Sequence, residues 1–162
     1  MEAITHCSWC NRDLGQTKYS HNDLAKGICL KCVEDMNILP HHDLTQYFTD
    51  DWVDDLAYGT IVIDENDVIL KYNRAESRTS KLSPESVEGK NFFIDVAPCT
   101  AVKEFQGVLQ ELRASESDGQ ESIKFTFNHR NFHAYVSILM TYFNEPGITV
   151  LSIKKMEEKE EN

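Results

Sequence analysis

Two neighbouring stretches with alternating apolar side chains constrain the fold of this chain more than any other feature of its sequence. Apolar residues occupy every second position across residues 123–127 and again across residues 132–140. A period of two is typical of a strand that buries one face. Two such strands in succession predict an antiparallel sheet that rests on a hydrophobic core.

Three more strands and several helices complete the predicted pattern. We expect strands at residues 60–64, 68–72 and 148–153, with turns at residues 65–67 and 144–147. Short helices and turns are expected across residues 74–82 and 83–93. The apolar face of a longer helix is formed by Val102, Phe105, Val108, Leu109 and Leu112. This order predicts an α+β fold, with a five-stranded antiparallel sheet and helices on one face.

The charge of the chain bears on its partners. The 162 residues include 16 Lys and Arg against 27 Asp and Glu, a net charge of -11. Such a surface repels nucleic-acid phosphates and anionic lipid, so we expect neither a nucleic acid nor a membrane as partner. A protein partner fits better. We see neither a signal peptide nor an apolar run long enough to span a bilayer, which predicts a cytoplasmic protein with reduced thiols.

Four of the five cysteines form two Cys-x-x-Cys pairs near the N-terminus: Cys7, Cys10, Cys29 and Cys32. The eighteen residues between the pairs fall in the range of four-cysteine zinc sites. Two such turns can complete a tetrahedron of thiolates, which leaves no open position for catalysis. The sequence therefore predicts a structural zinc site. A redox dithiol is the alternative, but no βαβ pattern surrounds either pair.

The fifth cysteine, Cys99, ends the stretch 89–100, which reads Gly-Lys-Asn-Phe-Phe-Ile-Asp-Val-Ala-Pro-Cys-Thr. Taken alone, such a cysteine is most often a small buried hydrophobe. Upstream, Tyr72, Glu76 and Ser80 are spaced i, i+4 and i+8, and would line one face of a helix. Such a face would present three hydrogen-bonding groups in a row, one of them a carboxyl.

These two stretches together resemble the photoactive yellow protein family, blue-light receptors with the PAS fold. The resemblance runs from about Trp52 to Lys154, and the stretch 89–100 is its most specific part. Together with the cysteine pairs, it predicts this division of the chain: a zinc-ribbon-like module at 1–39, a linker and N-terminal cap helix at 40–56, a PAS domain at 57–154 and a charged tail at 155–162.

The resemblance implies a covalent chromophore. The family binds p-coumaric (4-hydroxycinnamic) acid as a thioester on the cysteine that aligns with Cys99. Tyr72 and Glu76 would then donate hydrogen bonds to the chromophore phenolate, and the Ser80 hydroxyl would bond Tyr72. Because Glu76 can donate only when protonated, burial must raise its pKa. Light would isomerise the chromophore, and the proton of Glu76 would move to the phenolate. The buried carboxylate left behind would loosen the cap.

The chain departs from the family at the arginine that usually shields the chromophore, because Leu82 occupies its position. Arg130, in the loop before the fourth strand, is a candidate replacement. Two other functions compete with the photoreceptor. One is a PAS protein-interaction module without chromophore, and the other is an enzyme or thiol switch that acts through Cys99. No oxyanion-type arrangement is evident in the sequence, so we rank the enzyme last and do not expect one.

Overall fold

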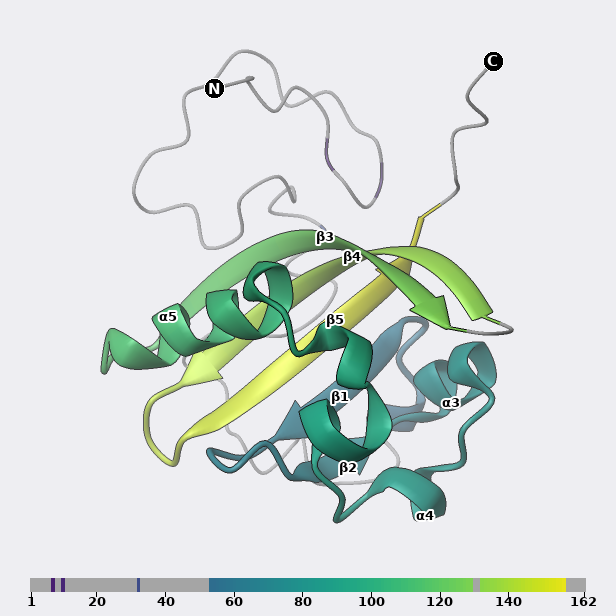
Figure 1. The fold of residues 1–162 in the computed structure, drawn as a ribbon, viewed down its shortest axis with the longest axis horizontal. Helices are drawn as coiled ribbons and strands as arrows, with labels where there is room; N and C mark the ends of the chain where they lie inside the picture. The colour runs from purple at the N-terminus through teal and green to yellow at the C-terminus, as the bar shows by residue number, and fades with distance from the viewer. Residues whose placement is uncertain (1–6, 8–9, 11–31, 33–52, 130–131, 157–162) are drawn as a thin grey trace.

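Five antiparallel strands form one sheet in the order β2-β1-β5-β4-β3 (Figure 1). In this computed structural model the described residues are 7, 10, 32, 53–129 and 132–156. The strands are β1 (Gly59–Ile63), β2 (Ile69–Tyr72), β3 (Gly119–His129), β4 (Phe132–Phe143) and β5 (Ile148–Lys155). The first and last strands of the domain, β1 and β5, pair with each other at the centre of the sheet. The predicted α+β class and antiparallel sheet are confirmed.

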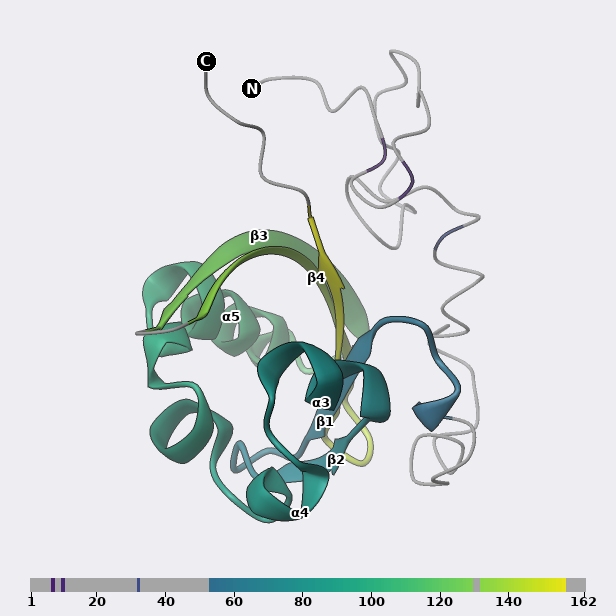
Figure 2. The same cartoon turned by 90° about the vertical axis from the view of Figure 1, so that its right-hand side faces the viewer.

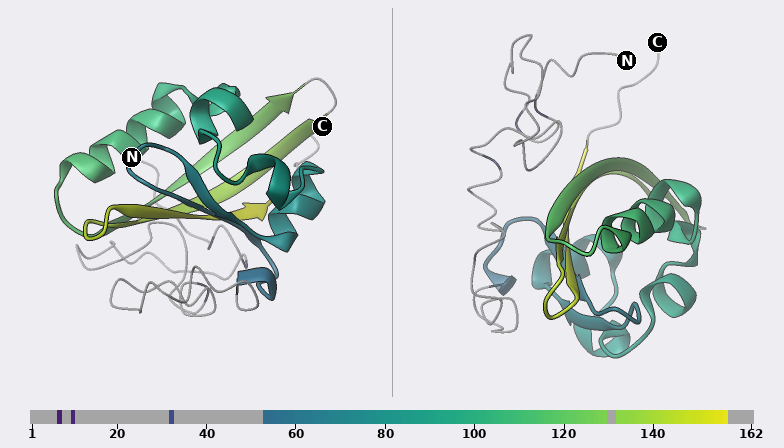
Figure 3. Two further views of the ribbon diagram at one scale, coloured as in Figure 1. Left: turned by 90° about the horizontal axis from the view of Figure 1, so that it is seen from below. Right: turned by 90° about the vertical axis from the view of Figure 1, so that its left-hand side faces the viewer.

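The helices between β2 and β3 lie over one face of the sheet (Figure 2). They are α3 (Arg74–Ser80), α4 (Pro84–Val87), η2 (Phe92–Val96), η3 (Pro98–Thr100), η4 (Lys103–Gly107) and α5 (Val108–Ala114). The strands β3 and β4 curve around α5, so that this part of the sheet is concave toward the helices (Figure 3). Short α, π and 3-10 turns therefore cover the sheet in place of long helices.

A cluster of phenylalanine rings joins the helices to the sheet. Phe92, Phe93 and Phe105 are almost completely buried, and their ring centroids lie 5.0–5.9 Å apart. Phe105 also contacts Phe125 of β3 with an edge-to-face geometry at 5.3 Å. Each such ring buries a large apolar area, and the edge-to-face contacts add about 0.5–1.5 kcal/mol per pair. The alternating residues of β3 and β4 therefore pack on η2 and η4.

The second face of the sheet is also shielded from solvent. Val62, Leu139 and Val150 point to this face and have no solvent exposure. Strands that are buried on both sides read as continuous apolar runs, and β1 has such a run at residues 61–63. The alternation seen in the sequence therefore identifies only one of two buried faces.

The structure differs from the predicted elements in three places. The long helix begins as the π-helical turn η4, and Val102 precedes it as a half-exposed cap, 40% exposed. Tyr72 closes β2, so it shares no helix with Glu76 and Ser80. The strand β5 runs through Lys155, a residue assigned to the tail. Most of the linker and cap helix expected at 40–56, and the tail beyond residue 156, lie outside the described residues.

Candidate functional site

A cavity of about 270 Å³ opens between α3, the segment 92–99 and the helix-covered face of the sheet. Cys99, Tyr72, Glu76 and Ser80 all line it, so the structure brings together every residue proposed for the chromophore site. The remaining lining residues are mostly apolar: Gly59, Ile61, Thr79, Leu82, Phe92, Val96, Ala97, Phe127, Val136, Ile153 and Lys155. Apolar walls with a few polar groups at defined positions are typical of a small-molecule site.

A short chain of hydrogen bonds holds the Tyr72 hydroxyl at this cavity. Tyr72 Oη lies 2.7 Å from Ser80 Oγ, which also accepts a hydrogen bond from the Leu82 N–H at 3.2 Å. The Tyr72 O–H donates the first of these bonds, and Ser80 Oγ accepts both. Burial and the Glu76 carboxyl raise the pKa of Tyr72, while the Ser80 bond opposes the rise. Tyr72 is therefore a proton donor at neutral pH.

Glu76 is buried on the side of α3 that faces the sheet. It is 9% exposed, and among the described residues nothing forms a hydrogen bond with its carboxyl group. Burial raises the pKa of Glu76 to about 8, so the carboxyl is mainly protonated at pH 7. The carboxyl lies against Gly59 of β1, where a Cβ atom would overlap it. Glycine at this position therefore makes room for the acid.

Asn73 fixes the helix that carries Glu76. Its Oδ1 atom accepts hydrogen bonds from the backbone N–H of Thr60 at 2.8 Å and of Glu76 at 3.0 Å. Its Nδ2 atom donates to the carbonyls of Val53 at 3.0 Å and Tyr58 at 3.1 Å. Asn73 has no solvent exposure. One side chain thus joins α3, β1 and the segment 53–58. The sequence analysis missed this residue, although an Asn three positions before a Glu is a helix-start signal.

Cys99 reaches the cavity from η3, between Phe93 and Phe105 in the sequence. Its turn is held by the neighbouring Thr100, whose N–H and hydroxyl both donate to the Ala97 carbonyl, at 2.9 and 2.6 Å. Cys99 itself is partly buried, and this burial raises the pKa of its thiol above the ordinary value. A hydrogen bond with its own backbone opposes the rise. The reactive thiolate is thus the minor form at neutral pH.

Comparison with known proteins identifies relatives of this chain. The family model described as the PAS fold matches residues 48–151. A photoactive yellow protein of Cereibacter sphaeroides is 34% identical over 91 residues, which cover 56% of this chain and 71% of that protein. The photoactive yellow protein of Rhodothalassium salexigens is 42% identical over 78 residues, which cover 48% of this chain and 62% of the relative.

The chain belongs to the photoactive yellow protein family. A solved structure agrees with this assignment: the photoactive yellow protein domain of the sensor histidine kinase Ppr from Rhodospirillum centenum. It superposes with a TM-score of 0.63 at 32% identity, over 69% of this chain and 97% of that domain. The predicted resemblance is therefore confirmed.

Leu82, which the sequence analysis aligned with an arginine of the family, lines the cavity and is 38% exposed. Arg130, the candidate replacement, lies outside the described residues. Lys155 also lines the cavity, and the sequence analysis missed it because it appeared to belong to a charged tail. Thr79 was missed too. Thr79 lies next to Ser80 on α3, and only the orientation of α3 in the fold reveals that it lines the cavity.

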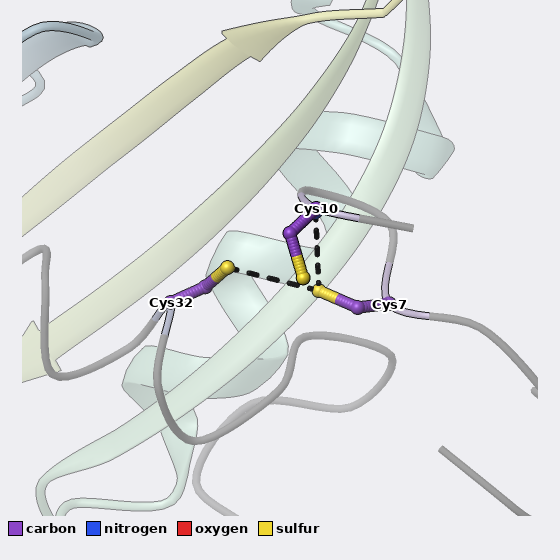
Figure 4. Close-up of side chains that lie close together, drawn as sticks. All are labelled: Cys7, Cys10 and Cys32. Carbon is purple, nitrogen blue, oxygen red and sulfur yellow. Dashed lines mark hydrogen bonds between the residues drawn. The ribbon is translucent and has the colours of Figure 1, made fainter. Parts of the chain in front are cut away.

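Three of the four N-terminal cysteines lie close together (Figure 4). The sulfur atoms of Cys7, Cys10 and Cys32 are all within 4.8 Å of one another, and those of Cys7 and Cys32 are 3.9 Å apart. The Cys10 N–H donates to the Cys7 sulfur at 3.5 Å. A disulfide would need about 2.05 Å, so Cys7 and Cys32 are not joined. The predicted fourth member of the cluster, Cys29, lies outside the described residues.

In the part of the chain that the structure describes, no helix is both long enough and apolar enough to cross a membrane.

Proposed function

We propose that this chain is a blue-light receptor that carries p-coumaric acid as a thioester on Cys99. One observation carries the proposal. Tyr72, Glu76, Ser80 and Cys99 line the same apolar cavity, and the buried Glu76 carboxyl makes no hydrogen bond within the described residues. Because the Glu76 carboxyl lines the cavity, a ligand bound there can complete its hydrogen bonding.

The residues of the cavity fit an aromatic acyl group. The cysteine supplies the nucleophile for a thioester. Tyr72 and protonated Glu76 supply two donors for a phenolate, and charge-assisted bonds of this kind are short and strong. The apolar walls, among them Phe92 and Val96, would exclude water from the ring. When bound, p-coumaric acid would supply a double bond that isomerises in blue light and a phenolate that can be protonated.

Glu76 is the residue that would move the proton. With a pKa of about 8 it holds the proton at pH 7 and can release it to a stronger base in the cavity. The carboxylate left behind would be buried and unpaired, which costs several kcal/mol. That is a large part of the 5–15 kcal/mol stability typical of a domain of this size. Deprotonation of Glu76 would therefore loosen α3 and the segment of the chain that is hydrogen-bonded to the start of α3.

The segment before the sheet is the part that α3 holds. Asn73 binds the carbonyls of Val53 and Tyr58, and the Arg74 N–H at the start of α3 donates to Asp54 Oδ1 at 2.9 Å. A change in α3 would thus reach residues 53–58 and the chain that precedes them. The output would be a changed surface for a protein partner, in keeping with the acidic charge of the chain.

The test is reconstitution of the purified protein with an activated p-coumaric thioester. The reaction is run above pH 8.5, where a larger fraction of Cys99 is thiolate. We expect a stable visible absorbance band that bleaches under blue light, and no band with Cys99→Ala. Folded protein without a band would overturn the photoreceptor and leave a chromophore-free PAS interaction module.

We further propose that Cys7, Cys10, Cys29 and Cys32 hold one structural zinc ion. Tetrahedral zinc with Zn–S bonds of about 2.3 Å separates its sulfur atoms by about 3.8 Å. The Cys7–Cys32 separation of 3.9 Å agrees with this geometry. A backbone N–H that donates to a ligand sulfur, as Cys10 does to Cys7, stabilises the thiolate form. The ion would supply the folding energy that a segment of this length lacks.

Metal analysis of the purified full chain tests the zinc proposal. We expect about one zinc per chain, lost in Cys10→Ser and in Cys29→Ser. The control is Cys99→Ser, which removes a cysteine from the cavity and should keep the zinc. A chain without metal, or a Cys29→Ser variant that keeps it, would contradict the proposed ligand set.

A further inference from the structure

Lys155 is fixed at the edge of the ligand cavity by the register of β5. It pairs with Val136 of β4, another residue that lines the cavity. One residue further, the Met156 N–H donates to the Tyr135 carbonyl at 2.8 Å, so the backbone on both sides of Lys155 is held on β4. The side chain of Lys155 therefore extends on the same face as Ile153.

Lys155 lines a part of the cavity beside which β1 is absent. Gly59, the first residue of β1, pairs with Ile153, so β1 does not run beside Lys155. Lys155 is exposed, while part of its side chain lines the cavity. Lysine often places its apolar stem along a wall in this way and keeps its ammonium group in water. The ammonium of Lys155 thus lies in solvent at the edge of the cavity, which we call the entrance.

The charges of the other lining groups leave this ammonium unopposed inside the cavity. Among the described residues that line the cavity, Lys155 alone is cationic and Glu76 alone is acidic. Burial keeps Glu76 mainly protonated at pH 7, with a pKa of about 8. The Tyr72 hydroxyl and the Cys99 thiol are neutral as well. The described residues that line the cavity therefore carry a net positive charge at pH 7, in a chain whose net charge is -11.

We propose that Lys155 makes this cavity selective for ligands that carry a negative charge, and so favours an anionic acyl donor at Cys99. The proposal rests on the proposed role of Cys99 as the acylated residue. In that reaction the Cys99 thiolate attacks the acyl carbon, a new C–S bond forms, and the leaving group departs with the electron pair of the broken bond. A donor with an anionic carrier would gain attraction at the entrance, where Lys155 lies.

A pair of small alkylating reagents tests this without any chromophore. Iodoacetate and iodoacetamide have nearly the same size and differ in charge. In both cases the thiolate displaces iodide, which leaves with the bonding electrons. The rates at Cys99 are measured in the full chain by peptide mass spectrometry, which separates this site from the N-terminal cysteines. The quantity of interest is the ratio of the iodoacetate rate to the iodoacetamide rate.

We expect Lys155→Met to lower this ratio about two- to fivefold at low salt, the factor expected for one partly screened charge. Lys155→Arg should keep the ratio. The matched control is Lys154→Met, because Lys154 is the neighbouring residue of β5 and pairs with Ser137 on the other face of the sheet. High salt should bring the native chain close to Lys155→Met, since it screens an exposed charge.

An unchanged ratio in Lys155→Met would overturn the proposal. An equal fall in Lys154→Met would also overturn it, because the effect would then come from overall charge. Neither result depends on whether the chain takes up p-coumaric acid. A chain that forms no chromophore band but shows the Lys155 effect would refute the photoreceptor alone, and a band without that effect would refute only the selectivity.

Discussion

The Asn73 side chain accepts a hydrogen bond from the Glu76 N–H at 3.0 Å, so one residue both starts α3 and positions its buried acid. The same oxygen binds Thr60 of β1, and the amide nitrogen binds two carbonyls of the segment 53–58. All four hydrogen-bonding positions of this amide are occupied, as a fully buried amide requires. Asn73 therefore anchors both the segment 53–58, which leads into the domain, and Glu76, the proposed proton donor of the cavity.

Asn73→Ala should destabilise the domain by about 2–4 kcal/mol, because it removes a helix cap and leaves several buried backbone groups unpaired. Urea unfolding of the full chain measures this change. The control is Asn66→Ala in the exposed turn after β1, which should alter stability by no more than about 0.5 kcal/mol. Equal effects of the two substitutions would show that the Asn73 network does not hold the domain together.

The raised pKa of Glu76 makes the stability of the apoprotein depend on pH. Unfolded Glu76 titrates near its ordinary value of 4.5, and folded Glu76 near 8, so between these values the folded chain keeps a proton that the unfolded chain has lost. The contribution of Glu76 to stability is therefore complete below pH 4.5 and is lost as the pH rises toward 8. Between these two pKa values, the free energy of unfolding falls by up to about 1.4 kcal/mol per pH unit.

Glu76→Gln should remove that slope. We expect its urea midpoint to rise relative to the native chain as the pH is raised from 5 to 8, because the amide has no proton to lose. Glu85→Gln is the control, since Glu85 is exposed on α4. If native protein and Glu76→Gln show the same pH dependence over this range, Glu76 is ionised in the folded chain and cannot serve as the proton donor.

The Tyr72–Ser80 bond should contribute about 1 kcal/mol, the usual net value for an intramolecular hydrogen bond. Ser80→Ala loses this bond, whereas Ser80→Thr keeps a hydroxyl at the same position and should lose less than half as much. Chemical denaturation resolves the difference. Ser86→Ala on the exposed side of α4 is the control and should change stability little. A Ser80→Ala variant as stable as the native chain would mean that the bond does not hold Tyr72.

Sequence reasoning found the strands and four residues of the cavity, but by different routes. Periodicity identified β3 and β4, because each has one apolar face at every second residue. The convergence of Cys99 with Tyr72, 27 positions earlier, came from the family motifs, since no local pattern links residues that far apart. Gly59 and Lys155 were missed because only the pairing of β1 and β4 with β5 places them at the cavity. Strand register of this kind is a tertiary property.

Gly59→Ala tests how closely Glu76 is fitted to the sheet. A methyl group at Gly59 would overlap the Glu76 carboxyl, which must then move away from β1 and toward water. We expect the pKa of Glu76 to fall from about 8 toward its ordinary value, and the pH dependence of stability to shrink as it does in Glu76→Gln. Carboxyl-resolved NMR titration of the apoprotein measures the pKa directly.

Gly107→Ala is the control, because a Cβ there would meet only the flexible Lys103 side chain at 3.5 Å. Helical glycine replaced by alanine should be neutral or stabilising by up to about 1 kcal/mol. A Gly59→Ala protein in which the pKa of Glu76 stays near 8 would show that the acid has room to adjust, and that Gly59 does not set its position.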